Sequence, residues 1–181
     1  MQAQALIHQV ADKADQQSRQ SLIALKPLAE DIVDLERILL PAGACFENEL
    51  ESSLPPAQCD PVVFHQIMLR GIRHARRALD PRGTLGIRLR NSSSGKRSCI
   101  SCREGFEGSF VELVIKDSAS RLDAADIECL TGVPPQHSPS GGALDDLAGI
   151  HALVHAQGGH LQIHRHEPAG ISLHMFFRAA D

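Results

Sequence analysis

The sequence contains no tryptophan, no tyrosine and only six phenylalanines among its 181 residues. Aliphatic side chains must therefore fill most of the core, and apolar residues, at 43% of the chain, are numerous enough to do so. No stretch approaches the ~20 apolar residues that span a bilayer. The N-terminus also lacks the basic segment followed by an apolar one that marks a secretory signal. These absences predict a cytoplasmic location and no membrane contact by this segment.

Strong positive charge is absent as well, because the formal net charge is −4. This charge argues against a general nucleic-acid binder, so no nucleic-acid partner is expected.

The five cysteines are odd in number and irregularly spaced, which does not fit a disulfide framework, and reduced thiols are expected. Cys99 and Cys102 form a Cys-x-x-Cys pair, but a zinc ribbon needs two such pairs. One pair favours a structural hairpin with two free thiols; the alternatives are a zinc ion shared across a dimer and a redox pair.

Periodicity and turn residues divide the chain into alternating helices and strands. Asp60-Pro61 is a strong helix start, because aspartate caps free amides and proline suits the first turn. Helices are expected at 3–25, 28–40, 61–79 and 144–157, a weak helix at 122–130, and strands at 44–51, 83–90, 97–103, 110–117, 160–166 and 171–178. Loops are expected at 91–96, at the turn 105–109 and at 131–142. This order predicts an α+β fold, a two-layer sandwich with a mixed, mostly antiparallel sheet and about three helices on one face.

Four segments resemble the ATP-binding domains of the GHKL class, and within it those of two-component histidine kinases. DPVVFHQIMLRGIRHARRAL is similar to the helix that carries the asparagine box, and GTLGIRLR to the strand after it. VELVIKDSASRL is similar to the first glycine box, and GIHALVHAQGGHLQIH to the helix and strand of the second. The resemblance covers roughly residues 26–178. It implies the Bergerat fold, with residues 1–25 as a helical lead, a remnant of a dimerisation helix, and residues 26–181 as a histidine-kinase-like ATPase domain.

The resemblance also shows where the ATP site departs from the family pattern. In the family helix two asparagines, four residues apart, face the nucleotide, and the second holds magnesium. The matching positions here are Arg70 and His74, and neither supplies the neutral oxygen that magnesium prefers. The first glycine box, Asp-x-Gly-x-Gly in the family, here keeps Asp117, which would bind adenine, and loses both glycines.

The phosphate-binding parts are altered too. The lid segment 131–138 lacks the phenylalanines and the lysine of the family. In the second glycine box Gly142 matches the first glycine, whereas Leu144 and Asp146 replace the others. Carboxylates at this box repel a polyphosphate. The sole histidine of the helical lead, His8, is followed by glutamine rather than by the acidic residue of a phosphoacceptor site.

Together these departures favour a pseudokinase of two-component signalling that has no catalytic residue and acts through protein contacts. No cofactor is expected. The expected partners are sensor kinase domains, a response-regulator receiver domain, or a second copy in a homodimer. One alternative is a divergent but active kinase domain that binds ATP and Mg²⁺ through Asp117. A second alternative is a histidine phosphotransfer protein on a kinase-like scaffold.

One further pattern concerns histidines in the last two strands. His160, His164 and His166 share one side of a strand, and His174 lies in the next. The expectation is an exposed polar face, with a metal-binding or pH-sensitive patch as the alternative.

Overall fold

The computed structural model describes residues 21–79, 82–122, 126–127 and 143–180. Its elements follow in the order β1 (Leu22–Ile23), α2 (Leu25–Ile38), β2 (Cys45–Leu50), β3 (Ala57–Gln58), α3 (Pro61–Ala78), β4 (Thr84–Ser98), β5 (Gly105–Asp117), α5 (Ala143–Ala156), β6 (His160–Arg165) and β7 (Ile171–Arg178). The predicted helical lead falls mostly outside the described residues, and its described end, residues 22–23, is a strand rather than helix. Most of the helix expected at 122–130 also lies outside the described residues.

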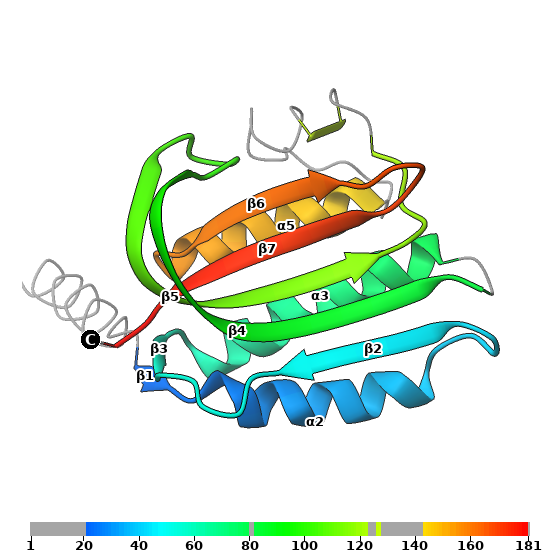
Figure 1. Cartoon of the computed structure of the whole chain (residues 1–181), viewed down its shortest axis with the longest axis horizontal. Coiled ribbons are helices and arrows are strands. Elements are labelled where there is room, and N and C mark those ends of the chain that lie inside the picture. The colour runs from blue at the N-terminus through cyan, green and yellow to red at the C-terminus, as the bar shows by residue number, and fades with distance from the viewer. Residues whose placement is uncertain (1–20, 80–81, 123–125, 128–142, 181) are drawn as a thin grey trace, which may run out of the picture.

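A five-stranded sheet in the order β2-β4-β5-β7-β6 forms one layer, and α2, α3 and α5 cover one of its faces (Figure 1). β2 and β4 run parallel, as the α3 crossover between them requires, and the other neighbours are antiparallel. The predicted α+β sandwich with a mixed, mostly antiparallel sheet is therefore confirmed. None of the helices in the described ranges is both long and apolar enough to span a membrane.

The main core lies between the helices and the sheet. Alternate residues of β4, namely Leu85, Ile87 and Leu89, are buried against the helices. From α3, Phe64 meets Phe177 of β7 edge-to-face, with ring centroids 5.6 Å apart. α3 begins where the sequence predicts, because one carboxylate oxygen of Asp60 accepts hydrogen bonds from the amides of Val62 and Val63.

Two element boundaries differ from the sequence prediction. α2 begins at Leu25 and includes Pro27 in its first turn, rather than starting after it. Amides of the first turn have no partner within a helix, so proline costs little there. In the second case, residues 91–96 are not a loop but continue β4, the strand expected at 97–103 ends at Ser98, and the predicted turn at 105–109 is part of β5.

The lengthened β4 and β5 form one long hairpin whose turn is residues 99–104, here called the hairpin tip. The polar run pairs across the hairpin, with Ser92 opposite Phe110 and Ser93 opposite Ser109, and a register irregularity lies between Ser94 and Arg97. Beyond it the hairpin curves over the sheet toward β6 (Figure 1). The amide of Ile100 donates to the carbonyl of Leu161, so the hairpin tip is attached to the outer edge of β6.

Candidate functional site

The residues predicted for an ATP site come from α3 and from the end of β5. Arg70 and His74 lie one turn apart on α3, and Asp117 is the last residue of β5. Gly142 lies outside the described residues, as do the lid segment 131–138 and His8. Leu144 and Asp146 belong to the first turn of α5. The structure thus places three of the four predicted site residues.

The Arg70 side chain lies directly against the neighbouring helix. A methyl group added at Gly149 of α5 would approach the Arg70 guanidinium to 2.4 Å, so in its present position the guanidinium lies directly against this glycine. Gly71, the next residue of α3, is similarly tight against Ile115 of β5, whose Cδ1 would lie 2.5 Å from an added methyl group. A long cationic side chain therefore fills space between α3 and α5 where the family presents a short amide.

His74 is only 2% exposed, and its Nε2 lies 3.5 Å from the hydroxyl oxygen of Ser120. Ser120 belongs to the segment matched to the first glycine box and is itself buried. The imidazole is therefore part of the packing between α3 and this segment. It does not present an oxygen ligand to a hard cation such as Mg²⁺.

Asp117 is 1% exposed, and its carboxylate organises its own turn. One oxygen, Oδ1, accepts hydrogen bonds from the amides of Ala119 and Ser120, the pattern of an aspartate that starts a turn. The β6–β7 turn then closes on this segment, because the amide of Gly170 donates to the carbonyl of Ser120 at 2.8 Å. At Gly170, with φ +107°, an added methyl group would lie 2.4 Å from the Asp117 carbonyl oxygen.

A cavity of about 260 Å³ lies beside this turn. Its lining comes from residues 120–122 after β5 and 165–170 between β6 and β7, and it includes Arg121, Arg165 and His166. Ligand pockets in proteins generally enclose ~300–1,000 Å³. The cavity next to the retained aspartate is thus smaller than a typical small-molecule site.

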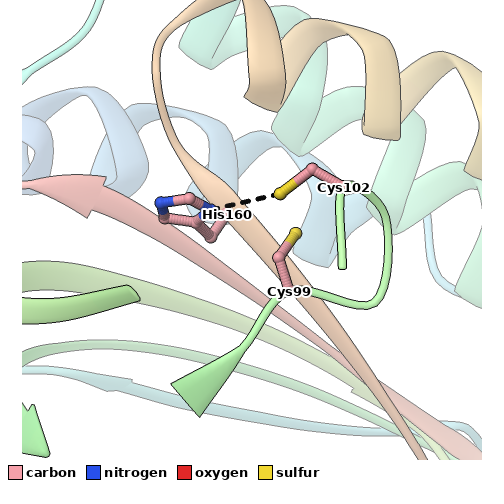
Figure 2. Close-up of side chains that lie close together, drawn as sticks. All are labelled: Cys99, Cys102 and His160. Atoms are coloured by element: carbon pink, nitrogen blue, oxygen red, sulfur yellow. Dashed lines mark hydrogen bonds between the residues drawn. The ribbon is translucent and has the colours of Figure 1, made fainter. Parts of the chain in front are cut away.

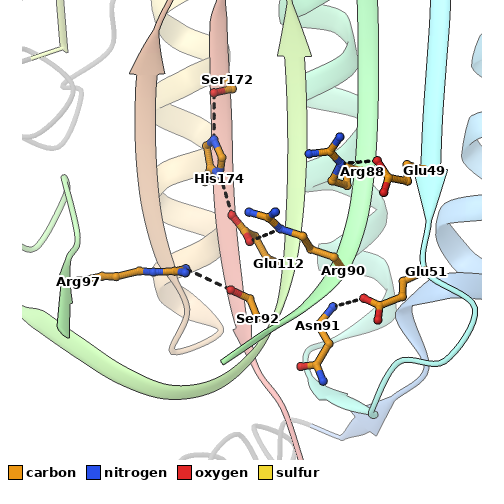
Figure 3. Close-up of polar contacts among 10 residues, drawn as sticks. All are labelled: Glu49, Glu51, Arg88, Arg90, Asn91, Ser92, Arg97, Glu112, Ser172 and His174. Carbon is orange, nitrogen blue, oxygen red and sulfur yellow. Dashed lines mark hydrogen bonds and ion pairs between the residues drawn. The ribbon is translucent and has the colours of Figure 1, made fainter. Parts of the chain in front are cut away.

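The sheet face turned away from the helices carries a polar network that the sequence analysis missed (Figure 3). At its centre is Glu112 of β5, whose side chain is 2% exposed. Arg90 of β4 donates to Glu112 Oε2 at 2.7 Å, and His174 Nδ1 of β7 lies 2.6 Å from Oε1. Burial by itself would raise the pKa of Glu112, but the hydrogen bonds from His174 and Arg90 outweigh it and lower that pKa to about 2.

The histidines of β6 and β7 are divided between two surroundings. Ser172 connects His174 to His166, with oxygen-to-nitrogen distances of 2.9 and 3.1 Å, and the His164 and His174 rings lie 4.7 Å apart. This part of the predicted polar face does gather into one network. His160 instead stacks on Phe106 at 4.3 Å and approaches Cys102 of the hairpin tip. The signal available in the sequence was the alternation of Arg88 and Arg90 with Ile87 and Leu89, which marks a polar outer face but not its partners.

Comparison with solved structures shows which fold this is. The chain superposes on the mycobacterial sensor histidine kinase MprB with a TM-score of 0.58 and 19% identity, covering 84% of this chain and 97% of that one. For the catalytic domain of histidine kinase ThkA the TM-score is 0.64 at 14% identity, with 88% and 95% covered. For the Acinetobacter baumannii histidine kinase AdeS it is 0.61 at 22% identity, with 99% and 81% covered.

Sequence comparison adds nothing to this, since no family model and no curated protein matches the chain. The structural likenesses extend over most of each molecule, at identities too low to indicate more than a shared architecture. The chain therefore has the fold of the catalytic domains of histidine kinases.

Proposed function

We propose that this chain is a histidine-kinase-like domain of bacterial two-component signalling that does not bind ATP and works through protein contacts. The main observation behind this proposal is the burial and hydrogen bonding of Asp117. It is the residue that keeps the family's chemical type at the adenine position, yet it is 1% exposed and bonds to its own turn. A carboxylate in that condition is poorly placed to accept a hydrogen bond from a base.

The two positions on α3 support the same proposal. Arg70 fills space against α5 at Gly149, and His74 is buried against Ser120. A nucleotide with its Mg²⁺ would have to displace the first side chain and would find no oxygen ligand at the second. Binding would therefore require the Arg70 side chain to leave this space and the ion to be held without an oxygen ligand from α3.

The test is the melting temperature of the full chain with and without millimolar Mg-ATP. A ligand at ~100 times its dissociation constant stabilises by about 2.7 kcal/mol, which raises the melting temperature of a chain of this size by roughly 5–10 °C. The expected result is no shift, with an ATP-binding histidine kinase catalytic domain as the positive control. A shift that Asp117→Asn removes would overturn the proposal and establish an active ATP-binding domain.

The second part of the proposal is contact with signalling proteins, either sensor kinase domains or a receiver domain. The exposed Arg77 lies one turn beyond Arg73 on α3 and belongs to a basic stretch of this helix. If this helix meets an acidic partner surface, Arg77→Glu should weaken binding and flatten its dependence on salt. Arg178→Glu, at the exposed end of β7, is the matched charge reversal and should leave binding unchanged. Equal effects of both substitutions would exclude α3 as the contact.

A further inference from the structure

The hairpin tip brings two cysteines next to a histidine that is distant in the sequence (Figure 2). Cys99 and Cys102 lie on the tip, and His160 is the first residue of β6. One donor atom from each, two sulfurs and a ring nitrogen, all lie within 4.8 Å of one another. Cys102 Sγ is 4.0 Å from Nδ1 of His160. Three side chains with metal-binding chemistry therefore converge on one point.

The backbone of the hairpin tip is built to hold the sulfurs in this place. The amide of Cys99 donates to the carbonyl of Glu104 at 3.0 Å, and the amide of Arg103 donates back to the carbonyl of Cys99 at 3.1 Å. Arg103 has φ +60°, a left-handed conformation that non-glycine residues seldom adopt. Such backbone outliers cluster at functional sites, where the surroundings hold them. The amide of Leu161 also donates to Cys99 Sγ at 3.3 Å, which fixes the direction of that sulfur.

The donor set is the one that zinc prefers. Structural zinc sites are tetrahedral and closed by four cysteine or histidine ligands, with Zn–S distances of ~2.3 Å and Zn–N distances of ~2.0–2.1 Å. In such a tetrahedron two sulfurs lie about 3.8 Å apart. The three donor atoms are already within 4.8 Å of one another, so displacements of roughly 1 Å would complete the arrangement.

A fourth ligand is close by. His155 lies on the last turn of α5, and its Nε2 is 3.4 Å from Cys99 Sγ. Because the rings of His155 and His160 are 6.1 Å apart, His155 must turn toward the common point to join the site. With it, the ligand set is Cys₂His₂, a combination known for structural zinc.

We propose that Cys99, Cys102 and His160, completed by His155, bind one zinc ion. The ion joins the hairpin tip, the start of β6 and the end of α5, three segments already held together by hydrogen bonds and by the burial of Cys99 and Leu161. Both cysteines are free thiols in the structure, as the sequence favours, and the proposal adds a metal to them; it does not depend on whether the domain binds ATP. Its role is structural, since a closed four-ligand site leaves no position open for a substrate.

The experiment uses the full chain, reduced and stripped of metal with a chelator, then titrated with zinc against a competing chromophoric chelator. The expected result is one zinc per chain, lost in Cys102→Ser and in His160→Ala. Cys102 is exposed, so its substitution should not prevent folding. Cys45→Ser removes another exposed cysteine and should leave zinc uptake unchanged. Cobalt(II) in place of zinc should give the visible bands of tetrahedral coordination with thiolate ligands.

Stability supplies a second readout. Zinc at ~100 times its dissociation constant should raise the melting temperature of the native chain and of Cys45→Ser by about 5–10 °C, and that of Cys102→Ser not at all. His155→Ala should bind zinc at least ~10-fold more weakly, since a ligand matters no less than the outer-shell groups that support it. No stoichiometric uptake by the reduced chain, or unchanged affinity in Cys102→Ser, would overturn the proposal.

Discussion

Replacing Glu112 by glutamine should weaken the fold and remove much of its sensitivity to acid. The substitution keeps the size of the side chain and removes its charge. Glu112 is 2% exposed and bonds to both Arg90 and His174 at 2.6–2.7 Å. After the change, Arg90 and His174 face a neutral amide in place of the buried carboxylate. The charge-assisted hydrogen bonds to Glu112 are weakened, although Arg90, at 42% exposed, keeps part of its contact with water.

The magnitude follows from the pKa of Glu112. The difference between 4.5 in the unfolded chain and about 2 in the folded one corresponds to about 3 kcal/mol of stability at neutral pH. Because the folded pKa is the lower one, this stability is fully present above pH 4.5. It is lost as the pH falls from 4.5 through 2, where the folded carboxylate finally takes up a proton.

The assay is urea unfolding of the native chain and of Glu112→Gln at several pH values between 7 and 2. The native chain should lose about 3 kcal/mol more than the variant over the acid range, and the two stabilities should converge near pH 2. Glu49→Gln is the matched control, because Glu49 pairs with Arg88 at the same 2.7 Å but is 70% exposed. An exposed pair contributes only ~0–1 kcal/mol. Equal losses in the two variants, or parallel acid profiles for the native chain and Glu112→Gln, would refute the reasoning.

Three further outcomes are expected. Gly159→Ala should destabilise the fold by about 1–3 kcal/mol, because the new methyl group would lie 2.6 Å from the backbone oxygen of Phe176. Gly149→Ala should instead be neutral or up to ~1 kcal/mol stabilising, since the flexible Arg70 side chain can move and alanine favours a helix. Thermal unfolding of both variants tests this contrast. Burial raises the pKa of the Cys59 thiol to about 12, so at pH 8 a thiol reagent followed by peptide mass spectrometry should label the exposed Cys45 and leave Cys59 unmodified until the chain unfolds. Asp60→Ala should cost ~1 kcal/mol in urea unfolding through loss of the α3 cap, and Asp60→Asn should retain most of that contribution.

The parts of the fold that could be predicted are those with local signals. Asp60-Pro61 specifies the start of α3 through one side chain and its own backbone, and the structure has that cap. The strands at 160–166 and 171–178 follow from alternation and from the turn through Gly170, and β6 and β7 appear there. In each case the residues that decide the structure lie within one turn or one strand, so a short window of sequence contains the cause.

The lengthened hairpin could not be predicted in the same way. A run of serines with glycine and lysine between residues 91 and 96 has the composition of a loop, and its strand conformation comes from the pairing of residues 91–94 with residues 108–111. The candidate zinc site has the same difficulty, because Cys102 and His160 are 58 residues apart and meet only through the curvature of that hairpin. For Asp117 two sequence signals disagree. The family resemblance indicates contact with a ligand, whereas the position at the end of a strand indicates a turn, and the structure shows the turn.

The helices cover one face of the sheet, whereas the other face is covered only beside the curved end of the hairpin, and by a different kind of chemistry (Figure 1). An antiparallel sheet commonly leaves one face to solvent. Here the helices cover one face with aliphatic side chains, while on the other Phe106, Phe110 and Phe176 form an aromatic cluster, with Arg97 above the Phe176 ring at 4.9 Å. Phe106 and Arg97 both belong to the curved end of the hairpin, so their contacts with Phe176 depend on the hairpin staying in place over the sheet. The buried Cys99 and Phe106 and the hydrogen bond from Ile100 to Leu161 hold this end of the hairpin in place, and a zinc ion between the tip, β6 and α5 would add a further anchor for the aromatic cluster.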